Sequence, residues 1–430
     1  MPHNSHFHRQ YLILNIINHL GPISRTELIN LTDYRPATVT DIIKELLDAG
    51  LIAETGNFSA GHGRKRTLLE MNQTHLCAIG ISFFSKSVIM IVSQFDGTIL
   101  KQEKLPFSPD AAKDVLIDEI IAKVQALSEE FSERKLLGIG IGEPAHDPTY
   151  YHGDHSLPAN FAHFNDWIRL DLKLRLHELL KLPVETYSAV ELPVMAEKRF
   201  GAAKGVQDFI CIELSNGIGA SICCNGTAVT GAKGIAGELG HTVIHHGDTP
   251  EKLCYCGKPD CVENQTAFPA LVSEIKSALN RGVFSSVTSH MEPDGKITVQ
   301  AIRKALDEKD RMCMHLTKAL AKRLGVVIAN AINILNPKLL VLSGFMLQLG
   351  DYFLEQLELA IHENTLFLMD DFELVISDSQ EHILPLGAVA EICSSYLHSH
   401  DFKWVYELQP SDLEERTFIQ NNFELTGDIL

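Results

Sequence analysis

Residues 1–72 show three helical patterns followed by a hairpin pattern. Apolar residues recur at helical spacing across residues 11–20, and Gly21-Pro22 ends this pattern. Ser24 and Glu27 have the spacing of a capping box, which predicts the start of a second helix. Pro36 suits the first position of a third helix, residues 36–49. Two short strands follow, so the pattern predicts a winged helix-turn-helix.

The predicted third helix buries one apolar face and shows small polar residues outward, as a helix that enters the major groove does. A glycine-rich loop then ends in three consecutive cations, which we expect to meet phosphates or the minor groove. A three-helix protein-binding module with a solvated basic turn is the alternative. The predicted DNA-contacting residues are Ser24, Arg25, Arg35, Ala37, Thr38, Thr40, Lys44, Arg64, Lys65 and Arg66.

The rest of the chain alternates β-branched apolar runs with helical patterns. Three strands, a helix and a fourth strand across residues 77–141 resemble one lobe of an actin-like ATPase fold. A second lobe opens with strands at 208–214 and 221–224 and becomes mostly helical. We therefore expect an α/β chain with a winged helix-turn-helix at 1–72, a first lobe at 73–200, a second lobe at 201–384, a helix at about 385–398 that closes on the first lobe, and a tail of unknown role at 399–430.

The composition supports a large protein with reduced thiols. The chain has 430 residues, of which 45% are hydrophobic, enough for two or three domains. Its formal charge of -18 disfavours polyanion binding over the whole surface, but the first seventy residues are neutral, with seven basic and seven acidic side chains. No apolar run has membrane-spanning length and the start is polar, so we expect a cytoplasmic protein without membrane insertion, whose nine cysteines are free or metal-bound.

A candidate metal site lies in the second lobe. Cys254, Cys256 and Cys261 fall in one short loop with Gly257, and His241 lies upstream, behind a strand expected at 242–246. Three thiolates and an imidazole are the ligand set of a closed structural zinc site. We expect one structural Zn²⁺ per chain on these four residues. The alternatives are three unrelated buried thiols or a disulfide, and the expected compartment argues against the disulfide.

Two carboxylates flank this ligand set: Glu238 before His241 and Glu263 after Cys261. A metal that holds the ligands would hold both acids beside one cleft, where carboxylates accept hydrogen bonds from sugar hydroxyls. The residues from Gly237 to His241 and from Cys254 to Glu263 resemble the ROK family of sugar kinases and sugar-responsive repressors. The resemblance covers about residues 11–398, and the N-terminal helix-turn-helix is similar to that of the repressor branch.

Comparison with the kinase branch separates the two functions. Family kinases have a glycine-rich phosphate turn where this chain has Gly80 to Lys86, with Ser82 in place of an acid. A second phosphate turn, residues 216–220, is retained, but the kinase's paired glycines at the adenosine end are reduced to Ser343-Gly344. The catalytic aspartate of the kinases aligns with Ala189, which cannot accept a proton. We therefore expect no kinase activity and no catalytic residue.

The resemblance implies a dimeric, sugar-responsive repressor that binds operator DNA and releases it when an effector occupies the cleft between the lobes. The effector would be a small sugar or sugar phosphate, and the assembly a homodimer or a dimer of dimers. The residues expected to bind the sugar are Glu238, His241, Glu263, Ser188 and Glu191. A regulator gated by a protein partner, such as a phosphotransferase-system subunit, and a sugar kinase are the alternatives.

Overall fold

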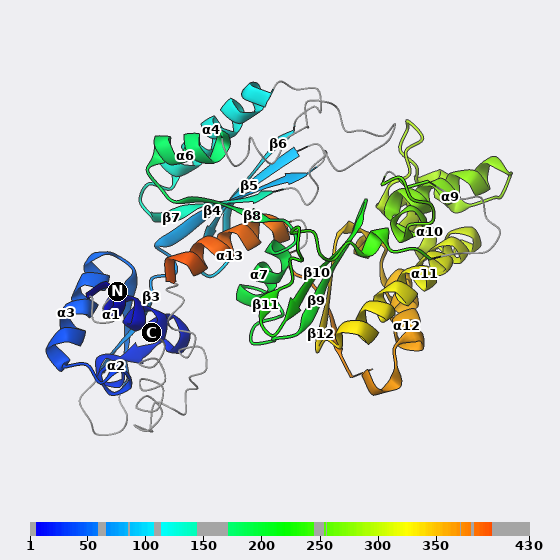
Figure 1. Cartoon of the computed structure of the whole chain (residues 1–430). Coiled ribbons are helices and arrows are strands. Elements are labelled where there is room, and N and C mark those ends of the chain that lie inside the picture. Colours follow the sequence, from blue (N-terminus) through cyan, green and yellow to red (C-terminus); the bar gives the residue numbers. More distant parts are fainter. Residues whose placement is uncertain are drawn as a thin grey trace.

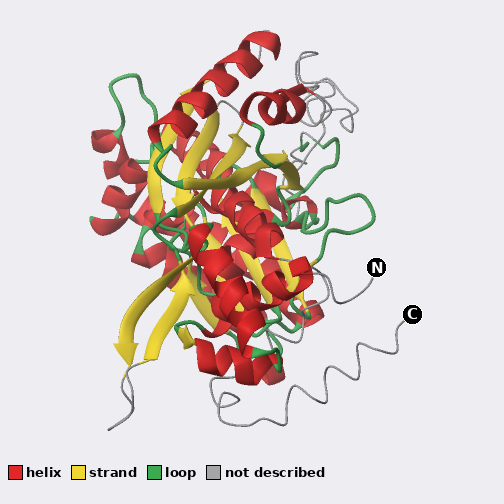
Figure 2. Ribbon diagram, turned by 90° about the vertical axis from the view of Figure 1, so that its left-hand side faces the viewer, coloured by secondary structure: helices red, strands yellow, loops and turns green. Residues whose placement is uncertain are grey.

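The computed structural model describes residues 6–58, 66–84, 87–106, 113–143, 171–244, 253–254, 256–369, 371–379 and 382–397. These residues form an N-terminal head and a body of two lobes, each lobe built on one five-stranded sheet (Figure 1). Figure 2 shows helices on both sides of the body's strands. The predicted α/β architecture, a winged helix-turn-helix followed by a two-lobed body, is confirmed. No described helix is long and apolar enough to cross a membrane.

The head has three helices and a small sheet. Its elements are α1 (His6–Leu20), β1 (Ile23–Ser24), α2 (Arg25–Thr32), α3 (Pro36–Asp48), β2 (Ile52–Phe58) and β3 (Arg66–Met71), with sheet order β1-β3-β2. The capping box of Ser24 and Glu27 starts α2, and Pro36 opens α3, as predicted. Gly50 has φ 68, a left-handed conformation that lets the chain leave α3 and enter β2. Local sequence signals therefore set the ends of these helices.

The first lobe has the strand order β6-β5-β4-β7-β8. Its elements are β4 (Leu76–Phe84), β5 (Ser87–Gln94), β6 (Ile99–Pro106), α4 (Lys113–Glu130), β7 (Lys135–Glu143), α6 (Lys173–Leu180) and β8 (Val184–Ser188). Alternate residues of β4 and β5 pack with α4 and α6 in one apolar cluster. The alternation of side chains along a strand leaves the other face for a different helix layer.

The second lobe has the strand order β11-β10-β9-β12-β13, with β12 parallel to both of its neighbours. Its strands are β9 (Phe209–Leu214), β10 (Ile218–Cys224), β11 (Thr227–Ala228), β12 (Leu339–Ser343) and β13 (Glu373–Ile376). Its helices are α8 (Val262–Thr266), α9 (Phe268–Asn280), α10 (Val299–Asp307), α11 (Arg311–Leu335) and α12 (Asp351–Asn364), with 3-10 turns η4 (Leu239–His241), η5 (Ser286–His290), η6 (Phe345–Leu349) and η7 (Phe367–Met369). Helix α11 packs its apolar face on β9 and β12 in the main core of this lobe.

Two helices connect the parts of the molecule. Helix α7 (Leu192–Arg199) packs through Val194 on the second sheet and also contacts α13 (Ile383–Leu397). Helix α13 lies across the free face of β4 and β7, as Figure 1 shows in orange. A Cβ at Gly80 would lie 2.0 Å from the Pro385 carbonyl oxygen, so glycine is needed for this close approach. The predicted closing helix therefore does return to the first lobe.

One apolar cluster joins the head to the first lobe. It contains residues of α1 and α3, the α13-facing side of the first sheet, and α13 itself. Asn15 of α1 is buried, and its side-chain amide donates to the carbonyl oxygens of Tyr11 and Leu397. Lys135 also donates to the Ala49 carbonyl oxygen at 3.1 Å. The head is thus packed on the body through the C-terminal end of α13.

Candidate functional site

The N-terminal half of α3 presents the exposed polar surface of the head. Its apolar residues Val39, Ile42 and Ile43 are fully buried against the other head helices. The residues expected to contact DNA lie on the opposite side: Arg35, Ala37, Thr40 and Lys44 are exposed and Thr38 is half-buried. This arrangement is what a recognition helix requires, because the base-contacting side chains must be free of the core.

Ser24 does not belong to this surface, which corrects the sequence interpretation. Ser24 is 2% exposed, its hydroxyl donates to the Glu27 carboxylate, and the same hydroxyl accepts from the Glu27 amide. The Ser24 side chain, which we had expected to contact DNA, therefore makes its hydrogen bonds within the helix cap. Arg25 is exposed and forms an ion pair with Glu54 at 2.6 Å. Arg64 and Lys65 lie outside the described residues, and Arg66 begins β3.

Two glycines place the first metal-ligand segment over β10. Gly237 has φ 87, and a Cβ there would lie 1.8 Å from the Ala220 carbonyl oxygen. A Cβ at Gly240 would similarly lie 2.5 Å from the Ile218 carbonyl oxygen. Because both positions lack a side chain, the segment crosses the strand closely. That crossing brings Glu238 and His241 to the end of the sheet.

The cysteine loop folds back on this segment. Cys254 donates its amide to the Lys258 carbonyl oxygen, and Gly257, with φ 84, donates to the Cys254 carbonyl oxygen. Cys261 is the residue before α8 and pairs with Val243 in an isolated β-bridge. The strand expected at 242–246 is absent from its described part: His241 ends η4, and only Val243 makes a bridge. Thr242, Val243 and Ile244 are β-branched, which favours a strand, but among the described residues of this segment only Val243 has a bridging partner, at Cys261.

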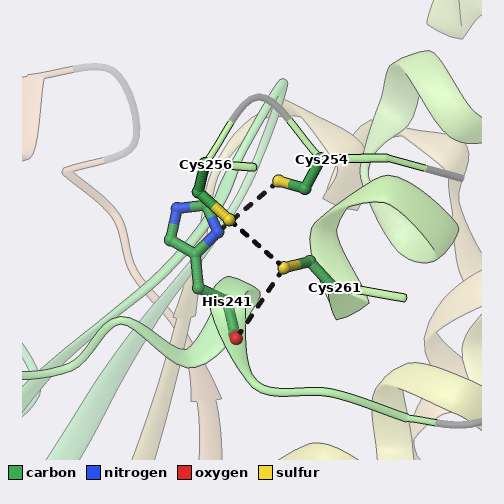
Figure 3. Close-up of side chains that lie close together, drawn as sticks. All are labelled: His241, Cys254, Cys256 and Cys261. Atoms are coloured by element: carbon green, nitrogen blue, oxygen red, sulfur yellow. Dashed lines mark hydrogen bonds between the residues drawn. The ribbon is translucent and has the colours of Figure 1, made fainter. Parts of the chain in front are cut away.

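The predicted ligand set converges in space. The ligand atoms of His241, Cys254, Cys256 and Cys261 all lie within 4.8 Å of one another (Figure 3). The Cys254 Sγ lies 3.7 Å from His241 Nδ1, and the Cys256 and Cys261 sulfurs are 3.5 Å apart. With Zn–S and Zn–N bonds of about 2.3 and 2.0 Å, tetrahedral ligand atoms lie about 3.5–3.8 Å apart. The donor set and its spacing therefore fit a tetrahedral metal ion.

The protonation chemistry of the cluster also suits a cation. All nine cysteines are free thiols, and the separation of Cys256 from Cys261 exceeds a disulfide bond length of about 2.05 Å. Burial raises the pKa of the Cys261 thiol, and the hydrogen bond with Cys256 and the charge of Cys254 raise it further. Burial also raises the pKa of the Cys254 thiol. A divalent cation is the partner that stabilises such thiolates.

A cavity of about 410 Å³ opens beside this Cys/His cluster, between the two lobes. Glu238, His241 and Glu263 line it, together with the glycine-rich segment from Gly217 to Gly219 and the start of α13. His241 Nε2 faces Glu238 at 3.7 Å, while its Nδ1 faces the cysteines. The imidazole thus connects the candidate metal site to the cavity.

Two of the residues expected to bind sugar lie beside the cavity and are not among its lining residues. The Ser188 hydroxyl donates to the Gly234 carbonyl oxygen at 3.1 Å. Glu191 precedes α7, and burial raises the pKa of its carboxyl, helped by the charge of Glu143. Burial, with the charge of Glu263 adding to it, raises the pKa of Glu238 to about 7.

The first phosphate-turn position is a strand. Residues Gly80 to Phe84 continue β4, and Phe84 pairs with Ser87 of β5. Ser82 is buried, and its hydroxyl has no hydrogen-bond partner among the described residues. The segment we interpreted as a degenerate turn is therefore mostly regular sheet. Ala189 lines the cavity, and its amide donates to the Glu143 carbonyl oxygen.

Sequence reasoning missed several residues that line the cavity, among them Glu213, Ile383 and Leu384. Glu213 lies on β9 opposite Gly219 and beside Ser343. Burial raises the pKa of its carboxyl, and a hydrogen bond with Ser215 opposes the shift. A lone acid within an apolar strand run was the available signal for Glu213. No local signal placed the start of α13 at the cavity, because it is far away in sequence.

Comparison with known proteins agrees with these observations. A model of the ROK family matches residues 78–382, and a model of the MarR family matches residues 8–56. A xylose repressor from Caldicellulosiruptor bescii is 30% identical over 392 residues, covering 90% of this chain and 95% of the relative. The DNA-binding transcriptional dual regulator NagC of Escherichia coli is 24% identical, covering 90% of this chain and 92% of that protein.

Solved structures show the same architecture. A ROK family transcriptional regulator, described as a homologue of the E. coli MLC protein, matches with a TM-score of 0.73 at 24% identity, covering 91% of this chain and 97% of that one. A ROK family glucokinase from Streptomyces griseus matches with a TM-score of 0.58 at 22% identity, covering 73% of this chain and 98% of that one. The glucokinase match covers less of this chain than the regulator match does. The helix-turn-helix, the two-lobed body and these matches together show that the chain belongs to the ROK family.

Proposed function

We propose that this protein is a sugar-responsive, DNA-binding transcriptional regulator. Residues 1–72 would bind operator DNA, and the cavity between the lobes, 73–200 and 201–384, would bind the effector. Effector binding would release the operator. The observation that carries the proposal is the continuous packing from the cavity, along α13, to a head with an exposed recognition helix.

Helix α13 supplies the physical connection between the two sites. Ile383 and Leu384 at its start line the cavity, and Leu397 at its end packs in the head cluster. The Asn15 amide holds the last turn through the Leu397 carbonyl oxygen. A ligand that binds one arrangement of the lobes more tightly would move this helix and the head with it. The relatives whose names identify them as repressors support this assignment.

We also propose one structural zinc ion per chain, held by His241, Cys254, Cys256 and Cys261. When bound, such an ion supplies a rigid crosslink between loops. The protein's own residues do the rest: Glu238 faces the far side of the His241 ring, and Glu263 follows Cys261 at the start of α8. Both carboxylates would accept hydrogen bonds from sugar hydroxyls. A homodimer and a phosphotransferase-system partner stay predictions from the family resemblance.

Phosphoryl transfer is not part of the proposal. Ala189 offers a methyl group where the kinase branch has its general base, and such a base contributes about 10²- to 10⁴-fold to the rate. Strand β4 runs to Phe84 where that branch has a phosphate turn. A coupled ADP-release assay with a broad sugar panel should therefore show no turnover. If the wild-type protein did turn over a sugar, and Glu191→Gln abolished that turnover, the protein would be a kinase after all, with Glu191 as its general base.

The decisive experiment measures DNA binding by fluorescence anisotropy. The full-length protein is titrated onto the duplex upstream of its own coding region and onto a scrambled duplex, at two salt concentrations. We expect tighter binding to the upstream duplex and release by at least one sugar. Arg64→Ala and Arg66→Ala should weaken binding to both duplexes and reduce the salt slope by about 0.9 for each phosphate that the variant no longer neutralises.

Lys276→Ala, which removes an exposed cation of α9 in the second lobe, is the matched control and should leave the slope unchanged. Equal binding to both duplexes, unaffected by the wing substitutions, would contradict a sequence-specific regulator. Sequence-specific binding that no sugar releases would contradict the sugar response and leave the DNA-binding function standing.

A further inference from the structure

The cavity between the lobes carries acids without cations. Glu213, Glu238 and Glu263 line it, and none of the described lining residues is lysine or arginine. His241 is the one basic group among them, and it is shared with the metal cluster. Three thiolates and one divalent cation carry a net charge of about −1, so a loaded metal site would not make the cavity positive.

The glycine-rich turn that could hold a phosphate is already occupied. The amide of Ile218 donates to Glu263 Oε2 at 2.9 Å. A Cβ at Gly217 would lie 2.8 Å from the same oxygen, which shows how closely the carboxylate approaches the turn. Backbone amides of such turns are an ordinary binding place for anions. Here the protein's own carboxylate takes that place.

A second acid lies on the strand that leads into this turn. Glu213 belongs to β9, directly opposite Gly219, so its carboxyl and that of Glu263 both line the cavity near the turn. A phosphate placed at the turn would therefore meet the Glu263 carboxylate, which is bound to the Ile218 amide, and the Glu213 carboxyl group on β9.

We infer that the effector of this cavity is a sugar without negative charge, and that Glu213 and Glu263 exclude sugar phosphates and nucleotides. This inference rests on the proposed sugar-responsive function and specifies its ligand class. The hydroxyl groups of a neutral sugar, or the ammonium group of an amino sugar, are donors that carboxylates accept. A phosphate group offers mainly acceptor oxygens at neutral pH and finds no lysine or arginine among the described lining residues.

Isothermal calorimetry on the full-length, zinc-loaded protein tests this with matched pairs: xylose and xylose 5-phosphate, glucose and glucose 6-phosphate, N-acetylglucosamine and its 6-phosphate, with glucosamine and ATP added. We expect at least one uncharged or cationic sugar to bind, and its phosphate ester to bind at least tenfold more weakly. The ratio of the dissociation constant of the phosphate ester to that of the free sugar should shrink as added salt screens the charges. Glu213→Gln, which keeps the size of the side chain, should reduce the ratio at least threefold.

Glu355→Gln removes an exposed acid of α12 and is the control that should leave the ratio unchanged. A phosphate ester or ATP that binds as tightly as the free sugars would overturn the inference while leaving the regulator function intact. A panel in which no member binds would overturn the sugar response itself, and the inference with it. If Glu213→Gln does not fold, the ratio of the two dissociation constants in the wild-type protein, and its dependence on salt, still test the inference.

Discussion

The head and the cavity place their polar groups in opposite ways. In the head, Arg35, Thr40 and Lys44 are exposed to water on and beside one short helix. In the cavity, Glu213 and Glu238 come from two distant segments, and burial raises the pKa of each carboxyl. The polar side chains of the head are thus exposed to water, whereas the carboxyl groups of the cavity are partly removed from it.

This difference shows what each region needs from the fold. A surface that meets DNA needs only a stable helix, because water and phosphates complete its interactions. A cavity that discriminates among sugars needs groups whose hydration has been removed, so that a mismatched partner is costly. Changes in the cavity should therefore alter stability, pH dependence and ligand response, whereas changes on the head surface should alter DNA binding alone.

Loss of the metal site should have the largest effect. Cys256→Ser removes one of four ligands, and structural zinc contributes about 10–16 kcal/mol in small zinc-binding domains. We expect the variant to lose stoichiometric zinc, to melt at a lower temperature and to lose any response to sugar. Metal analysis by mass spectrometry and calorimetric melting measure these outcomes.

Cys224→Ser is the control, because Cys224 is a partly exposed thiol of β10 outside the cluster. It should keep the zinc content and the melting temperature of the wild type. A Cys256→Ser protein with unchanged zinc content and melting temperature would contradict the structural role of the site. It would also contradict the expectation that changes in the body, unlike those on the head surface, alter stability.

Glu391 should make the body's stability depend on pH. It lies on α13, near Glu191, Tyr187, Lys198 and Arg199, and burial with the charge of Glu191 raises its pKa to about 7. The folded protein then holds the proton more tightly than the unfolded chain. This stabilising contribution is complete below about pH 4.5, the ordinary value for glutamate, and is lost as the pH rises through about 7.

Glu391→Gln removes this effect, so it should raise the free energy of unfolding at pH 8, at most on the order of 3 kcal/mol, and much less at pH 5. Urea denaturation at the two pH values measures it. Glu355→Gln, on the exposed face of α12, should show no such pH dependence. An equal change at both pH values for Glu391→Gln would mean that its carboxyl is not enclosed.

Asn15 tests the boundary between the two regions. Asn15→Ala removes the donor to the buried Leu397 carbonyl oxygen and should cost about 1–3 kcal/mol of stability. If α13 connects cavity and head, the variant should still bind operator DNA but need more sugar for release. Anisotropy titrations with increasing sugar measure this shift.

Asn333→Ala, which loses an amide hydrogen bond to the Asn364 carbonyl oxygen within the second lobe, is the matched control for Asn15→Ala. It should leave the sugar concentration for release unchanged. Equal release curves for Asn15→Ala and the wild type would show that the two regions communicate by another route.

The smallest effect should come from the recognition helix. Thr38→Ala leaves the head's fold intact because Thr38 is only half-buried, and each base contact contributes about 1–3 kcal/mol of discrimination. The variant should bind the operator more weakly and the scrambled duplex equally well. Melting temperature and sugar affinity should match the wild type. A change in sugar affinity would break the separation between the regions.

The sequence alone determined the elements whose signals are local. The capping box before α2, Pro36 at the start of α3 and Gly50 after it act on neighbouring backbone groups, and the structure has each of them. The candidate metal-ligand set was also readable, because three cysteines share one short loop, and the structure brings its four ligand atoms within 4.8 Å of one another. The same local rules misled where one residue fits two patterns. Ser24 fits both a helix cap and a DNA contact, and its hydroxyl is hydrogen-bonded to Glu27 in the cap.

Only the tertiary structure decided what surrounds each group. Residues 242–244 are all β-branched, which favours a strand, but a strand needs partners, and among the described residues of this segment only Val243 makes a bridge, to Cys261. The enclosure of Glu213, the occupation of the Ile218 amide by Glu263 and the double contact of α13 join residues far apart in the chain. Burial and long-range pairing arise when those segments pack, so no pattern within one segment contains them.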